Sequence, residues 1–165
     1  MQNSTKHSKI TAYYYHSMNS DFHLDKHLRI NNQRAAGIVI NNNKILLMHR
    51  IYKGVEYYVF PGGHLQKNEE LADAAIREIQ EETTIVVNNP VLVFEFRNYK
   101  KDNYDFYFIC DYVEGNPQLG GEEALKSNSE NFYEPMWVEF SKISELNILP
   151  KFAKEWVEET IIKQL

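Results

Sequence analysis

The chain has 165 residues, enough for one domain, and its 43% hydrophobic and 25% charged residues are typical of a globular protein rather than a disordered or fibrous one. The formal net charge of −5 argues against general nucleic-acid binding, because neutralising phosphates requires a basic surface. No apolar stretch approaches the roughly 18 residues needed to cross a bilayer, so we expect a cytoplasmic protein without a membrane anchor.

The chain changes character at Arg34. Residues 1–33 are polar and irregular, and we expect them to form an N-terminal extension that packs on the domain or is partly flexible. Residues 34–165 contain the regularly spaced apolar runs of a folded domain, so we place the domain there.

Two apolar runs open the domain, at 35–40 and 44–50, and Asn41–Asn43 lie between them. Asparagine tolerates the left-handed conformation of tight turns, so this pattern predicts a β-hairpin whose first strand is buried on both faces. A β-rich run at 56–60 predicts a third strand, which we expect to stop at Pro61-Gly62-Gly63.

The next predicted element is a helix over 69–83, followed by a second hairpin with strands at 91–97 and 104–112. A long polar loop is expected at 115–131, and such loops inside a domain are often functional. The remaining predicted elements are a last short strand and a closing helix, at 136–138 and 150–165.

Both predicted helices are amphipathic, which indicates that each covers a sheet. Their apolar residues at helical spacing are Ala72, Ala75, Ile76 and Ile79 in the first helix and Phe152, Trp156, Val157 and Ile161 in the second. Strands and helices in this order predict an α/β (α+β) fold in layers around a mixed β-sheet.

Three glutamates, Glu78, Glu81 and Glu82, fall within an arc of roughly 100° on the first helix, mostly opposite its apolar side. Like charges three and four residues apart repel, and the C-terminal end of a helix disfavours anions. A divalent cation such as Mg²⁺ or Mn²⁺ would reverse both penalties. The alternative is a solvated, glutamate-rich helix face without a ligand.

The turn before this helix, Pro61-Gly62-Gly63, offers backbone that can approach a ligand closely, because glycine has no Cβ. Its carbonyl groups are suitable metal ligands, and its amides are suitable phosphate ligands. The alternative is an ordinary turn at the end of a strand.

Gly63, Glu69 and the segment Arg-Glu-Ile-Gln-Glu-Glu-Thr-Thr-Ile at 77–85 together resemble the Nudix box of the Nudix hydrolases. Eight of the nine specified positions of the box match at the required spacing. The exception is Thr84, where the family has glycine just past the helix end. A β-branched residue is strained in a left-handed helix cap, so we expect a strained or shifted helix end.

The resemblance implies a Nudix-like α/β/α sandwich and a metal site built with Mg²⁺ or Mn²⁺. Carried over to this sequence, Glu78 and Glu82 would be the main metal ligands, with Glu81 in support or on a second ion. The Gly62 carbonyl would be a backbone ligand. Arg77 would pair with Glu69 and orient the carboxylates.

The resemblance also implies an activity. Nudix hydrolases cleave a phosphoanhydride bond of a nucleoside diphosphate linked to another moiety, so the expected partner is a small molecule that contains a nucleoside diphosphate. The family also includes enzymes that pair, which makes a homodimer a further expectation.

A general base is needed as well. Our first candidates are Glu122 and Glu123, because they follow Gly120-Gly121 in the polar loop, which could close over the metals. Glu81 is the second candidate. The alternative for Glu122 and Glu123 is a solvated, acidic loop tip.

Candidate substrate contacts are Gly63, His64, Arg50 and Tyr99. Aromatic side chains suit stacking on a nucleobase, although in a sheet they more often belong to the core. The aromatic residues concerned are Tyr99, Tyr104, Phe94 and Phe96. His23 and His27 have the spacing of a zinc site on a helix but lack a third ligand in register.

Two other functions remain open at this stage. The first is a catalytically weak Nudix-fold module that binds or senses a nucleotide, which Thr84 favours and the intact glutamates oppose. The second is an isomerase of isoprenoid diphosphates, which would require Cys110, the single cysteine, as a catalytic residue. We expect Cys110 instead to be a small buried hydrophobic residue.

Overall fold

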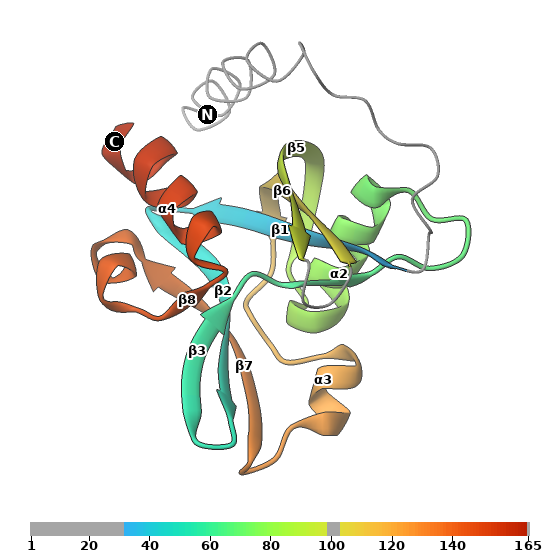
Figure 1. Cartoon of the computed structure of the whole chain (residues 1–165), viewed down its shortest axis with the longest axis horizontal. Helices are drawn as coiled ribbons and strands as arrows, with labels where there is room; N and C mark the ends of the chain where they lie inside the picture. Colours follow the sequence, from blue (N-terminus) through green and yellow to red (C-terminus); the bar gives the residue numbers. More distant parts are fainter. Residues whose placement is uncertain (1–31, 99–102, 165) are drawn as a thin grey trace.

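The computed structural model describes residues 32–98 and 103–164 (Figure 1). Strand β1, Gln33–Asn41, lies in the middle of the sheet. It pairs in parallel with β6, Asn103–Glu114, and antiparallel with both β2, Lys44–Tyr52, and β4, Gly62–His64. Every residue from Ala35 to Val39 is buried, which confirms the prediction of a first strand covered on both faces.

The sheet is mixed, as predicted, with the order β5-β6-β1-β2-β3-β8, while β4 pairs with β1 and β7 with β2. The β1–β6 and β3–β8 pairs are parallel and the others antiparallel. The remaining strands are β3, Val55–Val59, β5, Val86–Asn98, β7, Asn131–Glu139, and β8, Ile148–Leu149.

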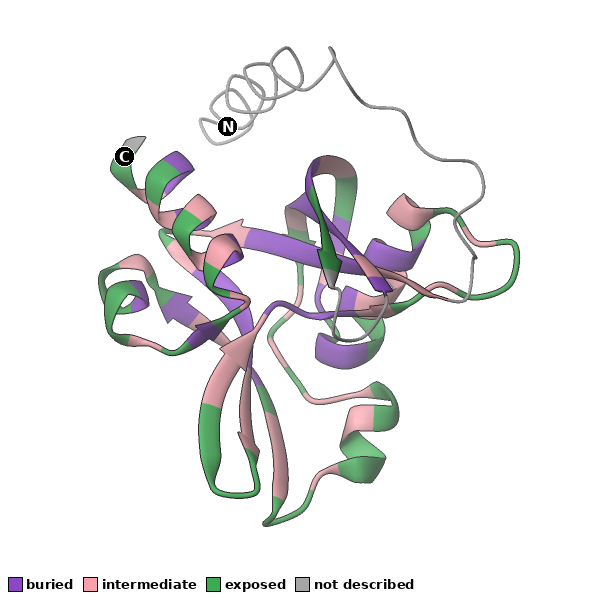
Figure 2. Cartoon of the chain, viewed as in Figure 1, coloured by how far each residue is buried: buried purple, intermediate pink, exposed green. Residues whose placement is uncertain are grey.

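Helix α2, Leu71–Thr83, and helix α4, Lys151–Thr160, cover opposite faces of the sheet. On the α2 face, Ala75 and Ile79 pack in one buried cluster with residues of β1, β2 and β6. On the α4 face, Ala153 and Val157 pack in a second cluster. Figure 2 shows the buried residues concentrated along β1 and the inner faces of the helices. This arrangement confirms the α/β/α sandwich.

The first predicted hairpin has the expected turn: Asn42 and Asn43 have φ angles of 49° and 60°. The second hairpin, β5–β6, is also present and longer than predicted. Within residues 32–98 and 103–164, no helix is long and apolar enough to cross a bilayer.

The glycines after Pro61 do not simply end a strand, as the sequence had suggested. Gly62–His64 form β4 and pair with β1. A Cβ at Gly62 would lie 2.3 Å from the carbonyl oxygen of Ala35, and Gly62 has a φ of 156°. Glycine is therefore needed at position 62 for the close approach of β4 to β1.

The region after β6 contains more structure than the predicted polar loop. Helix α3, Gly121–Lys126, lies within it, and β7 begins at Asn131 rather than Met136. The outer half of β7 pairs with the half-buried end of β2, and its two aromatic residues stand between Asn131 and Glu134-Pro135, which is a weak strand signal. A 3₁₀ helix, η2 (Phe140–Glu145), and β8 follow, so β7 is not the last strand.

Helix α4 ends at Thr160 and is followed by a 3₁₀ turn, η3 (Ile162–Gln164), so the predicted single helix to the C-terminus is too long. Its predicted inward side is correct. Val157 and Ile161 are buried, and Phe152 and Trp156 pack against the same cluster.

Candidate functional site

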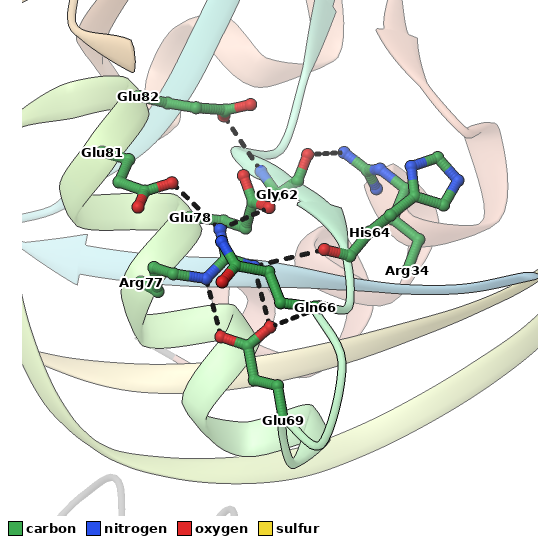
Figure 3. A network of polar contacts seen from close by, with 9 residues as sticks. All are labelled: Arg34, Gly62, His64, Gln66, Glu69, Arg77, Glu78, Glu81 and Glu82. Carbon is green, nitrogen blue, oxygen red and sulfur yellow. Dashed lines mark hydrogen bonds and ion pairs between the residues drawn. The ribbon is translucent and has the colours of Figure 1, made fainter. Parts of the chain in front are cut away.

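Arg77 connects helix α2 to the loop before it (Figure 3). Its Nε and Nη2 donate to the two carboxylate oxygens of Glu69, at 2.6 and 2.9 Å, and Nη2 also donates to the His64 carbonyl, at 3.2 Å. Its Nη1 donates to Glu78 and Glu81, at 2.8 and 2.9 Å. These bonds lower the pKa of Glu69 and fix three carboxylates relative to one another.

Glu82 is buried, with 8% of its surface exposed, and its Oε2 accepts a hydrogen bond of 3.0 Å from the Gly62 N–H. The sequence placed it on a face mostly opposite the apolar side, and this was wrong for Glu82, which packs inward beside β4. Burial raises its pKa to about 8, with a further contribution from the charge of Glu123.

Glu78 occupies space that only a glycine at position 63 leaves free. A Cβ on Gly63 would lie 2.4 Å from the Glu78 carboxyl carbon. Burial raises the pKa of Glu78, and its bond to Arg77 opposes that shift. Because Gly63 has no side chain, the Glu78 carboxylate can pack directly against the backbone of β4.

Gly62 lies between Glu82 and Arg34. Its N–H points to Glu82, whereas its carbonyl accepts a hydrogen bond of 2.7 Å from Arg34 Nη2. Arg34 was not among the residues predicted from the sequence. The signal that could have found it is a charged residue at the start of an otherwise apolar, buried strand.

Helix α3 docks on the C-terminal end of α2. The N–H groups of Gln118 and Gly120 donate to the carbonyl oxygens of Thr83 and Glu82, at 2.9 and 3.1 Å. A Cβ on Gly120 would lie 2.4 Å from the Glu81 carbonyl oxygen, so glycine permits this close approach. The free carbonyls at the end of α2 are thereby partly satisfied.

This docking distinguishes the two acidic residues of α3. Glu123 lies close enough to Glu78 and Glu82 for its charge to raise the pKa of both. Glu122 is exposed and pairs with Lys126, which lowers the pKa of Glu122. Of the two predicted base candidates, the structure brings Glu123 to the glutamates of α2.

Helix α2 ends in the left-handed conformation despite its threonine. Thr84 has φ 61° and ψ 5°, and its N–H donates to the Gln80 carbonyl at 2.9 Å. Its hydroxyl donates to the Asn116 carbonyl, at 3.0 Å. The helix therefore ends in the left-handed cap that usually carries glycine, and the position of its end is not shifted. Thr84 accordingly adopts the strained backbone conformation predicted for a β-branched residue.

Replacing Thr84 by glycine is expected to raise the free energy of unfolding by about 0.5 kcal/mol. Relief of about 1–2 kcal/mol of left-handed strain exceeds the lost hydroxyl contact and the greater backbone freedom of glycine in the unfolded chain. Thr84→Ala, which loses the hydroxyl and keeps the Cβ, should be no more stable than wild type. Urea unfolding of the three proteins measures this order, and a Thr84→Gly variant less stable than Thr84→Ala would contradict it.

Arg50 lies on β2 with its guanidinium carbon 3.5 Å from the ring centroid of Tyr133 and its Nη2 2.9 Å from Asn131 Oδ1. Leu46, four residues earlier on the same face of β2, belongs to the cluster under α2. Arg50 is therefore on the α2 side of the sheet. The His64 side chain is exposed, and Tyr99 lies outside the described residues.

The other aromatic candidates divide between core and surface. Phe94 is buried and stacks on Tyr107 with ring centroids 4.7 Å apart, so the core alternative is correct for Phe94. Phe96 is 37% exposed, and Tyr104 packs on the α2 side. The histidines at 23 and 27 lie outside the described residues.

Cys110 is buried on the α2 side of the sheet, in the core, as expected. Burial raises the pKa of its thiol to about 12. A catalytic cysteine needs an accessible thiolate, so this environment does not support the isomerase alternative.

The donor groups of the site suit a hard divalent cation. The charge of Glu123 adds to the raised pKa of both Glu78 and Glu82, and an ion bound among these carboxylates would relieve that repulsion. In this conformation, no three histidine, cysteine or acidic side chains in the described ranges are close enough to hold an ion. Arg77 engages oxygens of both Glu78 and Glu81.

Comparison with known protein families identifies the family of this chain. The sequence model of the NUDIX domain family matches residues 31–160. The chain therefore belongs to the Nudix hydrolase family, as the box between Gly63 and Ile85 predicted.

Individual relatives are more distant. An uncharacterized Nudix hydrolase of Bacillus subtilis, YvcI, is 32% identical over 100 residues, which are 56% of this chain and 62% of that protein. The chain thus spans less than two thirds of that relative's length. An ADP-ribose pyrophosphatase of Methanocaldococcus jannaschii is 29% identical over 77% of this chain and 68% of its own. The crystal structure of a NUDIX hydrolase from Nitrosomonas europaea shares the fold, with a TM-score of 0.62 and 20% identity over 81% of this chain and 73% of that one.

Proposed function

We propose that the protein is a metal-dependent hydrolase that cleaves a phosphoanhydride bond of a nucleoside diphosphate linked to another moiety. The observation that carries this proposal is the buried carboxylate of Glu82, near the end of the Nudix box, held against the N–H of Gly62, which directly precedes the box. Burying a carboxylate is costly, and binding a cation provides a reason for it.

In this proposal, Glu78 and Glu82 hold Mg²⁺ or Mn²⁺, and Glu81 supports them or contributes to a second ion. The Gly62 carbonyl would be a further ligand beside its bond to Arg34, since a carbonyl oxygen has two lone pairs. When bound, the metal neutralises the diphosphate and lowers the pKa of coordinated water. Arg77 and Glu69 keep the carboxylates in place through the bonds described above.

Glu123 is the proposed general base, because α3 brings it close to Glu78 and Glu82, where a water attacking phosphorus would lose its proton. Glu81 remains the second candidate. It is half exposed, and one of its carboxylate oxygens already accepts a hydrogen bond from Arg77.

Glu123→Gln is expected to lower kcat about 100-fold, the usual loss when a general base is removed. Glu122→Gln is the matched control, because the neighbouring side chain is exposed and paired with Lys126, and it should keep kcat within about twofold. Steady-state kinetics of both variants measure the difference. Equal losses in the two variants would contradict the assignment of Glu123.

The substrate contacts are proposed to lie on the α2 side of the sheet. There, Gly63 lies against the Glu78 carboxylate, and Arg50 and Tyr133 present a cation stacked on an aromatic ring. His64 bonds Arg77 through its carbonyl, whereas its side chain lies on the same face of the sheet as Arg34. ADP-ribose is the first substrate to test, because a relative of 29% identity is an ADP-ribose pyrophosphatase. A homodimer also remains a prediction.

The test is phosphate release from a panel of ADP-ribose, nucleotide sugars, dinucleoside polyphosphates, NADH, coenzyme A and nucleoside triphosphates, coupled to a phosphatase where needed. Each compound is assayed with Mg²⁺, with Mn²⁺ and with a chelator. We expect metal-dependent turnover of at least one member. No turnover by folded protein that binds Mn²⁺ would contradict hydrolysis and favour the nucleotide-binding module.

A further inference from the structure

Arg34 holds the backbone on both sides of Pro61. It lies on β1, opposite His64 of β4 in the sheet register. Its Nη2 donates to the Gly62 carbonyl at 2.7 Å and to the Phe60 carbonyl at 3.4 Å. A single guanidinium group therefore fixes the segment that leads from β3 into the site.

Gly62 has no side chain to anchor it, so hydrogen bonds to its backbone set its position. Its carbonyl is bound by Arg34 on one side, and its N–H is bound to Glu82 on the other. Figure 3 shows Gly62 between these two side chains. A movement of the Gly62 backbone would therefore move the donor that orients the Glu82 carboxylate.

Arg34 itself is supported from the α4 side of the sheet. It interacts with the hydroxyl of Tyr107, whose side chain is 1% exposed. The Tyr107 ring is fixed by stacking on Phe94 and by an edge contact with Phe60, with centroids 5.9 Å apart in the second pair. Arg34 thus connects the packed core under α4 to the carboxylate on α2.

We propose that Arg34 is a positioning residue of the metal site: it holds Gly62 so that the N–H orients Glu82 and the carbonyl stays in place as the further ligand that the proposed function assigns to it. This inference rests on the proposed function. It differs from a substrate-binding role, which would place the guanidinium on the phosphates. It also differs from a purely electrostatic role, because removing a nearby positive charge would strengthen cation binding.

The test compares wild type with Arg34→Met and Arg34→Lys in Mn²⁺ binding, measured without substrate from the electron paramagnetic resonance signal of free Mn²⁺. Arg34→Met is expected to weaken Mn²⁺ binding about 10-fold or more, the usual cost of removing a group that orients a metal ligand. Arg34→Lys should recover part of the loss, because an ammonium group can still donate to the Gly62 carbonyl. Arg97→Met, the same substitution on the exposed part of β5, should leave binding within about twofold.

Steady-state kinetics at saturating Mn²⁺ provide the second readout. We expect kcat to fall in Arg34→Met with KM changed by less than about twofold. Unchanged or tighter Mn²⁺ binding by folded Arg34→Met, or a rise in KM alone, would overturn the proposal. If Arg34→Met does not fold, Mn²⁺ binding by Arg34→Lys equal to wild type would overturn it as well. If the wild-type protein neither binds Mn²⁺ nor turns over substrate, that result would instead contradict the proposed function.

Discussion

Glu82→Gln is expected to lower kcat about 1,000-fold with either Mg²⁺ or Mn²⁺. The amide has nearly the shape of the carboxylate and can still accept a hydrogen bond from Gly62, so the fold should be kept. It lacks the charge that a hard cation requires. Steady-state kinetics on the substrate found in the panel measure the loss. Turnover within about tenfold of wild type would contradict a ligand role for Glu82.

The same substitution is expected to stabilise the metal-free protein by about 1–3 kcal/mol near neutral pH, because wild type must there either keep Glu82 protonated or bury its charge, and the neutral amide does neither. The pKa of Glu82 rises from 4.5 to about 8 in the folded state. The folded protein therefore holds the proton more tightly, and stability is lost as pH rises from about 4.5 to about 8.

Thermal unfolding in the presence of a chelator tests the expected direction of this pH dependence. The Tm advantage of Glu82→Gln over wild type should grow between pH 5 and pH 8, and Glu122→Gln should show no such trend. A wild-type protein as stable as Glu82→Gln at pH 8 would show that the buried carboxylate is already compensated without a metal.

Arg77→Ala has the second largest expected effect. It should lower the free energy of unfolding by about 2–3 kcal/mol, because it removes charged hydrogen bonds from Glu69 and Glu78, whose side chains are only 13% and 14% exposed. Because both glutamates are largely buried, we expect these ion pairs to contribute more to the free energy of unfolding than exposed salt bridges usually do. Turnover should also fall about 100-fold, because the carboxylates lose their relative placement.

Arg77→Lys separates charge from geometry. An ammonium keeps the positive charge but cannot bind both oxygens of Glu69 while reaching Glu78 and Glu81. We therefore expect Arg77→Lys to recover only a small part of the stability and the activity, measured by urea unfolding and by steady-state kinetics. A lysine variant equal to wild type would show that charge alone is sufficient.

The parts of the site that the sequence predicted are those with local contacts. Arg77 and Glu69 are eight residues apart across one loop and the start of α2, and the resemblance to the Nudix box implied their pairing. The β1–β2 hairpin was predictable for the same reason, because its turn chemistry lies within Asn41–Asn43. Apolar periodicity similarly located α2 and the inward side of α4.

The parts that the sequence did not predict depend on distant pairings. The contact of Arg34 with Gly62 spans 28 residues and requires the β1–β4 register. The burial of Glu82 depends on β4 passing beside α2, which a helical projection does not contain. The choice between Glu122 and Glu123 depends on how α3 docks on α2, and neighbouring residues of identical type carry no signal about that.

The most direct test of the central claim, that Glu82 is buried to hold a divalent cation, is calorimetric titration of Mn²⁺ into wild type and Glu82→Gln near neutral pH, with Glu122→Gln as a control. We predict saturable binding by wild type and by Glu122→Gln, and binding by Glu82→Gln at least about 10-fold weaker. Equal Mn²⁺ affinity in all three proteins would contradict the claim.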